Sequence, residues 1–175
     1  MSEDTTPAAS AGPAQRALDR LSDLTIGVAA TALLGLVLVQ GWQVFARYVI
    51  NDSPSWTEPV TVLLLSTAMS LGAASGVHTN RHFGFFLLAD SLPPALRRVV
   101  HAVSPLVMML IGSVIAYWAS VLLLDGLDVR IAGAPMPQSI AYLPLAAGGA
   151  LMVLFAFNRL LLVLRAPSLS AAGAR

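Results

Sequence analysis

The sequence predicts an all-α membrane protein with four transmembrane helices, and three observations support this fold class. Only 11% of the 175 residues are charged and 57% are hydrophobic, whereas a soluble domain carries about 25% charged residues. Four long segments, almost free of charge, contain nearly all the apolar residues. No segment shows the alternation over about ten residues that is typical of a membrane β-barrel strand.

The first span is predicted over residues 24–46, which carry no formal charge until the arginine that follows them. At 1.5 Å per residue this segment is roughly 34 Å long, enough to cross a hydrocarbon core of about 30 Å. Residues 1–20 are polar, contain prolines and lack the apolar region of a signal peptide. We expect them to form a disordered cytoplasmic tail that runs into a short helix start.

Three further spans follow within a membrane domain predicted over residues 21–165. The second covers residues 59–77 and opens with Pro59, which suits the first turn of a helix because proline's missing N–H costs no bond there. The third and fourth are expected at about 99–124 and 139–160, and a C-terminal tail at 166–175.

The arginines predict the orientation of the chain. Eight of the ten lie in the two ends and in the connection between the second and third spans, and two lie in the other connections. The positive-inside rule therefore places both termini in the cytoplasm. The same connection contains an apolar segment, residues 80–92, that is too short to cross a bilayer. We expect it to lie in the cytoplasmic membrane interface, in contact with lipid; the alternative is a loop packed on its own helices.

Composition excludes several functions. The net charge of +1 lacks the basic excess of a nucleic-acid-binding protein. The absence of cysteine excludes disulfide scaffolds, thiol nucleophiles, iron–sulfur clusters and cysteine-based zinc sites. The central parts of the spans carry no ionisable residue, whereas membrane pumps and enzymes usually place such residues deep in the bilayer. We therefore predict no catalytic residue and no ion-coupled site within this chain alone.

Three histidines are the candidate ligands for a metal or a haem. His78 and His82 share a helix face at a spacing that can bind zinc, but no third ligand follows nearby. His78 and His101 are alternative haem ligands between the second and third spans. We prefer to interpret all three as polar residues at headgroup level, and we predict no cofactor and no metal.

A polar stripe on the first span predicts a protein contact. Gln40, Gln43 and Arg47 lie on one face of its outer half. Because amides are costly in lipid, the stripe should face either a partner or this chain's own helices. Arg47 and Glu58 bracket the first loop with opposite charges and are placed to form a weak pair there.

Small residues recur at a spacing of four in every span, as at Ala68, Gly72 and Gly76 in the second. Such stripes allow helix backbones to approach closely in lipid. They indicate a close-packed bundle, a partner surface, or both.

The stretch 44–98 resembles the small membrane subunit of tripartite ATP-independent periplasmic (TRAP) transporters, the DctQ-type family. An Arg-Tyr pair ends the first span, Trp-x-Glu opens the second, and a histidine, an apolar stretch and Leu-Pro follow before arginine. The matching residues are Arg47, Tyr48, Asn51, Trp56, Glu58, Gly72, His82, Leu92, Pro93 and Arg97. Pro59 stands where the family often has a second acid. The resemblance covers about residues 20–165.

The resemblance implies a small permease subunit of the bacterial inner membrane. Such a subunit scaffolds a large membrane subunit during sodium-coupled uptake of an organic acid, which a periplasmic binding protein delivers. The candidate residues for contact with the large subunit are Gln40, Gln43, Arg47, Tyr48, Trp56, Glu58, Gly72, Arg81 and His82. Two alternatives are a haem- or quinone-binding anchor of a respiratory oxidoreductase and an autonomous homo-oligomeric exporter, which would require an acid within a span.

Overall fold

The computed structural model describes residues 12–52, 54–79 and 94–165, with residues 94–102 and 165 described by their backbone alone. The helices are α1 (Pro13–Phe45), the π-helical turn η1 (Ala46–Ile50), α2 (Thr57–Thr79), α4 (Pro94–Asp125) and α5 (Ser139–Arg165). Within these described ranges, four helical segments are long and apolar enough to cross a membrane, the first of them running without a break from Pro13 to Ile50. The structure thus confirms the four-helix membrane fold class.

Helix α1 begins earlier than the sequence predicted. Pro13 occupies its first turn after Gly12, so residues 13–20, assigned above to the disordered tail, form its first two turns. The helix start expected at the end of the tail is therefore longer than polarity and proline content indicated, and Gln15 and Asp19 of this stretch contact other helices. The rest of the predicted N-terminal tail, the C-terminal tail 166–175 and the interfacial segment 80–92 lie outside the described residues.

The other boundaries differ from the prediction by a few residues. Helix α2 is two residues longer at each end than the predicted span 59–77. Pro59 lies in its first turn, as expected, and is buried there. Helix α4 begins at Pro94 instead of residue 99, and α5 continues past residue 160 to Arg165. Helices α2 and α4 continue into polar flanks that hydropathy does not mark, whereas the extension of α5 past residue 160 is apolar up to Leu164 and was cut short by Arg159.

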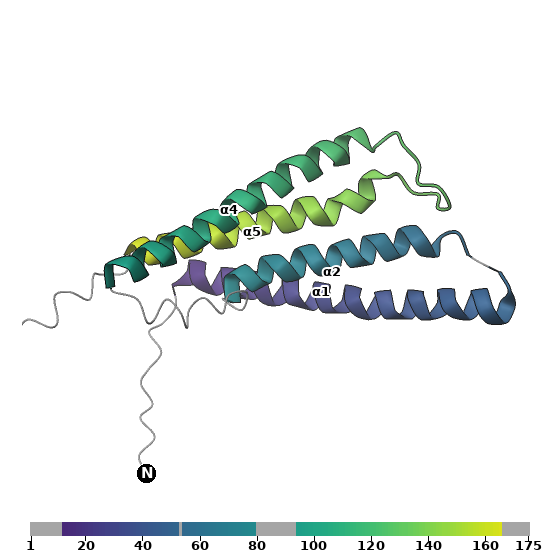
Figure 1. Ribbon diagram of the computed structural model, residues 1–175, viewed down its shortest axis with the longest axis horizontal. Helices are drawn as coiled ribbons and strands as arrows, with labels where there is room; N and C mark the ends of the chain where they lie inside the picture. The colour runs from purple at the N-terminus through teal and green to yellow at the C-terminus, as the bar shows by residue number, and fades with distance from the viewer. Residues whose placement is uncertain (1–11, 53, 80–93, 166–175) are drawn as a thin grey trace, which may run out of the picture.

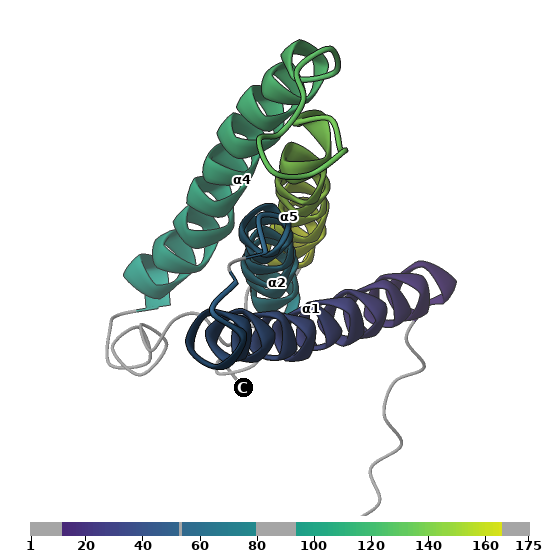
Figure 2. The same ribbon diagram turned by 90° about the vertical axis from the view of Figure 1, so that its right-hand side faces the viewer.

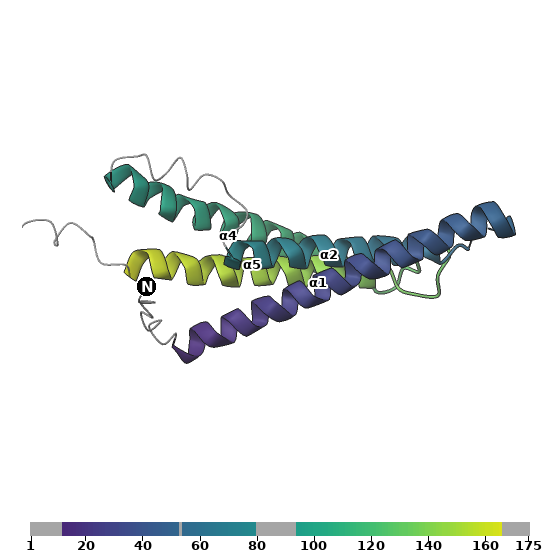
Figure 3. The same ribbon diagram turned by 90° about the horizontal axis from the view of Figure 1, so that it is seen from below.

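The four long helices form an open row in the order α4, α5, α2, α1 (Figures 1 and 2). Helix α4 packs on α5, α5 packs on α2, and α2 packs on α1. Seen end-on, α4 leans away from α2 (Figure 2), and α1 crosses beneath α2 and α5 at an angle (Figure 3). Below, "loop end" means the end that holds η1 and residues 126–138, and "terminal end" means the end where α1 and α4 begin.

Two glycines of α5 bring this helix close to both of its neighbours in the row, α4 and α2. A Cβ atom on Gly149 would lie 2.7 Å from the backbone nitrogen of Ala116 in α4, and one on Gly148 would lie 2.6 Å from the Cβ of Ser70 in α2. Both distances are too short for any side chain, so the α4–α5 and α2–α5 contacts require glycine. By contrast, no described atom lies within 4 Å of a Cβ on Gly72. At some positions the small residues therefore allow helices of this chain to pack closely, whereas at others, such as Gly72, no neighbouring helix is in contact.

Candidate partner interface

The predicted polar stripe on α1 turns partly towards α2. Gln40 is exposed, and its Nε2 donates to Thr61 Oγ1 of α2 at 3.2 Å. Gln43 is half-buried. Of the two interpretations left open for this stripe, contact with the chain's own helices applies to Gln40.

The pair predicted between Arg47 and Glu58 does not form. Arg47 lies in η1 and Glu58 in the first turn of α2, both side chains are exposed, and the ion pair recorded in the described part of the chain is a different one. A solvated pair of this kind gains little energy, so nothing forces the two groups together. Glu58 instead carries a negative charge near the N-terminus of α2, where the helix dipole favours it.

The other residues predicted to contact the large subunit lie in or beside two helical segments, η1 and α2. Tyr48 in η1 is 79% exposed, Trp56 is 43% exposed just before α2, and Gly72 faces open space on α2. Arg81 and His82 lie outside the described residues. The seven described candidates therefore form two groups, one on α1 with η1 and one on α2, and their role in binding a partner stays a prediction.

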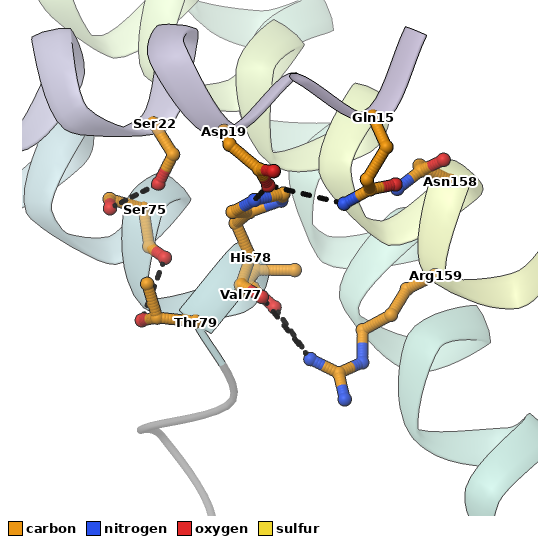
Figure 4. A network of polar contacts seen from close by, with 9 residues as sticks. All are labelled: Gln15, Asp19, Ser22, Ser75, Val77, His78, Thr79, Asn158 and Arg159. Atoms are coloured by element: carbon orange, nitrogen blue, oxygen red, sulfur yellow. Dashed lines mark hydrogen bonds and ion pairs between the residues drawn. The ribbon is translucent and has the colours of Figure 1, made fainter. Parts of the chain in front are cut away.

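A polar cluster at the terminal end was missed by the sequence analysis (Figure 4). His78 Nε2 of α2 lies 2.8 Å from Asp19 Oδ1 of α1, and the His78 side chain is 12% exposed. Gln15 Nε2 donates to Asp19 Oδ1 at 3.2 Å, and Asn158 Nδ2 of α5 donates to Gln15 Oε1 at 3.2 Å. Three helices are thus joined by one chain of contacts.

Two further contacts strengthen this end. Arg159 Nη1 of α5 donates to the carbonyl oxygens of Val77 and His78, at 3.3 and 3.4 Å, so a cation satisfies carbonyls at the C-terminal end of α2. Ser22 and Ser75 hydroxyls form a buried hydrogen bond of 2.9 Å between α1 and α2. Together these bonds join the terminal ends of α1, α2 and α5, and the Ser22–Ser75 bond among them is buried.

The sequence contains little that reveals this cluster. Asp19 and His78 are 59 residues apart and Gln15 and Asn158 are 143 apart, so no spacing rule connects them. The one indication in the sequence is that polar residues lie at the same end, here the terminal end, of three of the predicted spans. The predicted alternative pairs of His78 with His82 or His101 involve side chains outside the described part.

A large groove lies between α2 and α4 with α5 as its floor. It has a volume of about 950 Å³ and is lined by Val62, Leu65, Ser66, Met69 and Ala73 of α2, Ile115 of α4, Leu145, Gly148, Gly149 and Met152 of α5, and other residues of α2, α5 and the 130–132 loop. Glu58, Arg130, Gln138 and Tyr142 line it towards the loop end. We call this space the α2–α4 groove.

Comparisons with known proteins identify the family of this chain. The family model described as "Tripartite ATP-independent periplasmic transporters, DctQ component" matches residues 36–166. The sialic acid TRAP transporter small permease protein SiaQ of Vibrio cholerae is 27% identical over 84 residues, which make up 47% of this chain and 49% of that protein. The match to this curated relative thus spans about half of its length. Because the family model matches well over half of the chain, this multi-pass bacterial inner-membrane protein belongs to the DctQ component family of TRAP transporters, whose members are transporter components and not enzymes.

Proposed function

We propose that this chain is the small permease subunit of a TRAP transporter and that it scaffolds a large membrane subunit, which carries the substrate. The match to the DctQ component model over residues 36–166 is the observation that carries the proposal. The curated relative is named as the corresponding subunit of a sialic acid transporter. We therefore propose an organic acid as the substrate class, delivered by a periplasmic binding protein and taken up with sodium.

The composition of the spans supports a scaffold role. The central parts of the four spans contain no ionisable residue, and coupling sites in membranes usually depend on such residues. The polar contacts of the cluster at the terminal end join α1, α2 and α5 to one another. These features suit a rigid body better than a moving carrier.

The arginine distribution supports an orientation with both termini in the cytoplasm. In this orientation the polar cluster lies at the cytoplasmic end of the row. The mouth of the α2–α4 groove, with Glu58 and Arg130, lies at the periplasmic end.

A haem- or quinone-binding anchor is not favoured. His78 is the one candidate ligand whose side chain the structure describes. Its Nε2 already contacts Asp19 Oδ1 at 2.8 Å, and its ring packs against the ring of Phe155 at a tilt of 46°, with centroids 4.9 Å apart. A Soret band in the purified protein that disappears in His78→Ala would overturn this view.

Reconstituted transport tests the proposed function. The chain is co-expressed with a candidate large permease subunit and a candidate binding protein from the same genome, and uptake of a labelled organic acid into proteoliposomes is measured with and without a sodium gradient. We expect the two membrane subunits to co-purify, and we expect uptake to require both of them together with sodium. Full uptake by proteoliposomes that lack this chain, or flux through this chain alone, would contradict the scaffold role.

A further inference from the structure

We propose that a pocket at the terminal end binds the headgroup of a zwitterionic phospholipid, with the phosphate on Arg159 and the primary amine beside Asp19 and Asp23. The inference goes beyond the proposed function, because it concerns this chain and the lipid around it and does not involve the large subunit. Three features carry it: a half-buried cation that has no anionic partner among the described residues, two carboxylates in the same pocket, and an apolar wall beside them.

The pocket lies where the first turns of α1 meet the ends of α2 and α5. It has a volume of about 770 Å³, which is within the range of pockets that bury small ligands. One part of its lining is polar and includes Gln15 and His78, and another part is apolar and includes Phe155 and Leu162. It shares no residue with the α2–α4 groove. We call this space the terminal pocket.

Arg159, which lines the terminal pocket, lies at a depth where a positive charge is costly. The next five residues of α5, 160–164, are all apolar, and the helix ends at Arg165. At 1.5 Å per residue, Arg159 is therefore roughly 9 Å inside the helix end. Its side chain is half-buried. A cation in such a place needs polar or anionic groups around it, because burial removes its hydration.

The partners that the structure gives this cation are neutral. Arg159 Nη1 donates to the carbonyl oxygens of Val77 and His78, and the ion pair recorded among the described residues joins His78 to Asp19 instead. Figure 4 shows the second terminal nitrogen of Arg159 pointing away from the two carbonyls. The guanidinium thus has further N–H groups to donate, and a phosphate accepts two such bonds side by side.

The two acids of the terminal pocket decide which headgroup fits. Asp19 and Asp23 line it together with Arg159, so a headgroup with a net negative charge would meet two carboxylates. Both printed contacts of Asp19 use Oδ1, and its side chain is 48% exposed, which leaves the other oxygen accessible to an ammonium group. Phosphoethanolamine supplies a phosphate and an ammonium with N–H donors. A phosphoglycerol headgroup has no cation, and a phosphocholine headgroup has no N–H to donate.

The apolar wall favours a lipid over a free phosphate compound. Leu162 is 51% exposed and lines the terminal pocket with Val163, within about one helical turn of Arg159. Acyl chains cover such a surface, whereas a soluble phosphate leaves it in water. In the proposed orientation the pocket lies at the cytoplasmic end of the row, where cationic pockets between transmembrane helices bind lipid headgroups.

Native mass spectrometry of the purified chain tests the terminal pocket. The chain is freed of co-purified lipid in detergent and is incubated with an equal mixture of phosphatidylethanolamine, phosphatidylcholine and phosphatidylglycerol that carry the same acyl chains. We expect phosphatidylethanolamine to be retained at least fivefold more than either of the others, and we expect Arg159→Gln to lower its retention at least fivefold. The control Arg20→Gln removes an exposed arginine of α1 outside the pocket and should change retention less than twofold.

A pair of steric variants tests the pocket without changing Arg159, whose replacement also removes the bonds to the end of α2. Leu162 and Leu164 of α5 are 51% and 61% exposed, and of the two Leu162 lines the pocket. Leu162→Trp should lower the retention of phosphatidylethanolamine at least fivefold and Leu164→Trp less than twofold, with the helical circular dichroism of both unchanged.

Equal retention of the three lipids, a preference for phosphatidylglycerol, or equal retention in the two tryptophan variants would overturn the proposal. So would displacement of the lipid by an excess of inorganic phosphate, which would identify a site for the free anion. None of these results bears on the proposed function, which is tested separately with the large subunit present.

Discussion

Replacement of Gly149 by alanine tests whether close backbone contact holds α4 on α5. A Cβ at this position would lie 2.7 Å from Ala116 N, 3.0 Å from Ala116 Cα and 3.0 Å from Gly112 O. These are backbone atoms, which do not move aside as a flexible side chain does. Reaching an ordinary contact of 3.4 Å requires the two helices to separate locally by about 0.7 Å, and a gap of that size forfeits about a quarter to a half of the dispersion energy of the atoms concerned.

The magnitude follows from two opposing effects. Overpacking of a well-packed contact costs about 1–3 kcal/mol. Alanine is a better helix former than glycine by about 1 kcal/mol. The difference between the two leaves a loss of up to about 2 kcal/mol in the free energy of unfolding of Gly149→Ala, with about 1 kcal/mol as the central value. The matched control is Gly72→Ala, in which the new methyl group meets no described atom within 4 Å; we expect no loss there and a gain of up to about 1 kcal/mol.

Both variants are measured by circular dichroism during unfolding of the purified chain in mixed micelles of increasing SDS fraction. A difference of about 1.4 kcal/mol corresponds to a tenfold change in the folding equilibrium. Equal stability of the two variants, or a more stable Gly149→Ala, would refute the view that this glycine is required for close packing.

Three further predictions concern the polar residues and the loop. Asp19→Ala removes the carboxylate bonded to His78 and should weaken the attachment of the first turns of α1 to α2 by about 1 kcal/mol. Amide hydrogen exchange in these turns should then be at least threefold faster, while exchange in α5 stays unchanged. Unchanged exchange in α1 would contradict this prediction. Because Arg47 and Glu58 do not pair, a double-mutant cycle of their alanine variants should give a coupling energy below about 0.3 kcal/mol in unfolding, and a coupling near 1 kcal/mol would show that they do pair. Gly133 has φ +88°, and a Cβ there would lie 2.6 Å from a backbone oxygen. Gly133→Ala should therefore lower the free energy of unfolding by about 1–2 kcal/mol. The same SDS titration measures this loss, with Ala132→Gly as the control.

The sequence determined the fold class and the approximate spans. In lipid every backbone polar group needs an internal partner, so a long uncharged segment has essentially no alternative to a helix. Length and charge therefore located four helices, although polarity misled the assignment of residues 13–20. Pro59 was correctly placed in a first turn because proline has a fixed φ angle and no N–H, which are properties of the residue itself.

The tertiary structure decided which surfaces these helices share. Gly72 and Gly149 belong to similar small-residue patterns in the sequence, yet one faces open space and the other lies against the α4 backbone. Asp19 meets His78 across 59 residues of chain, and Arg47 does not meet Glu58 across eleven. Helix formation depends on contacts within a few residues, which a sequence displays directly. The order and tilt of the helices depend on contacts between residues far apart in the chain, and those exist only once the row is packed.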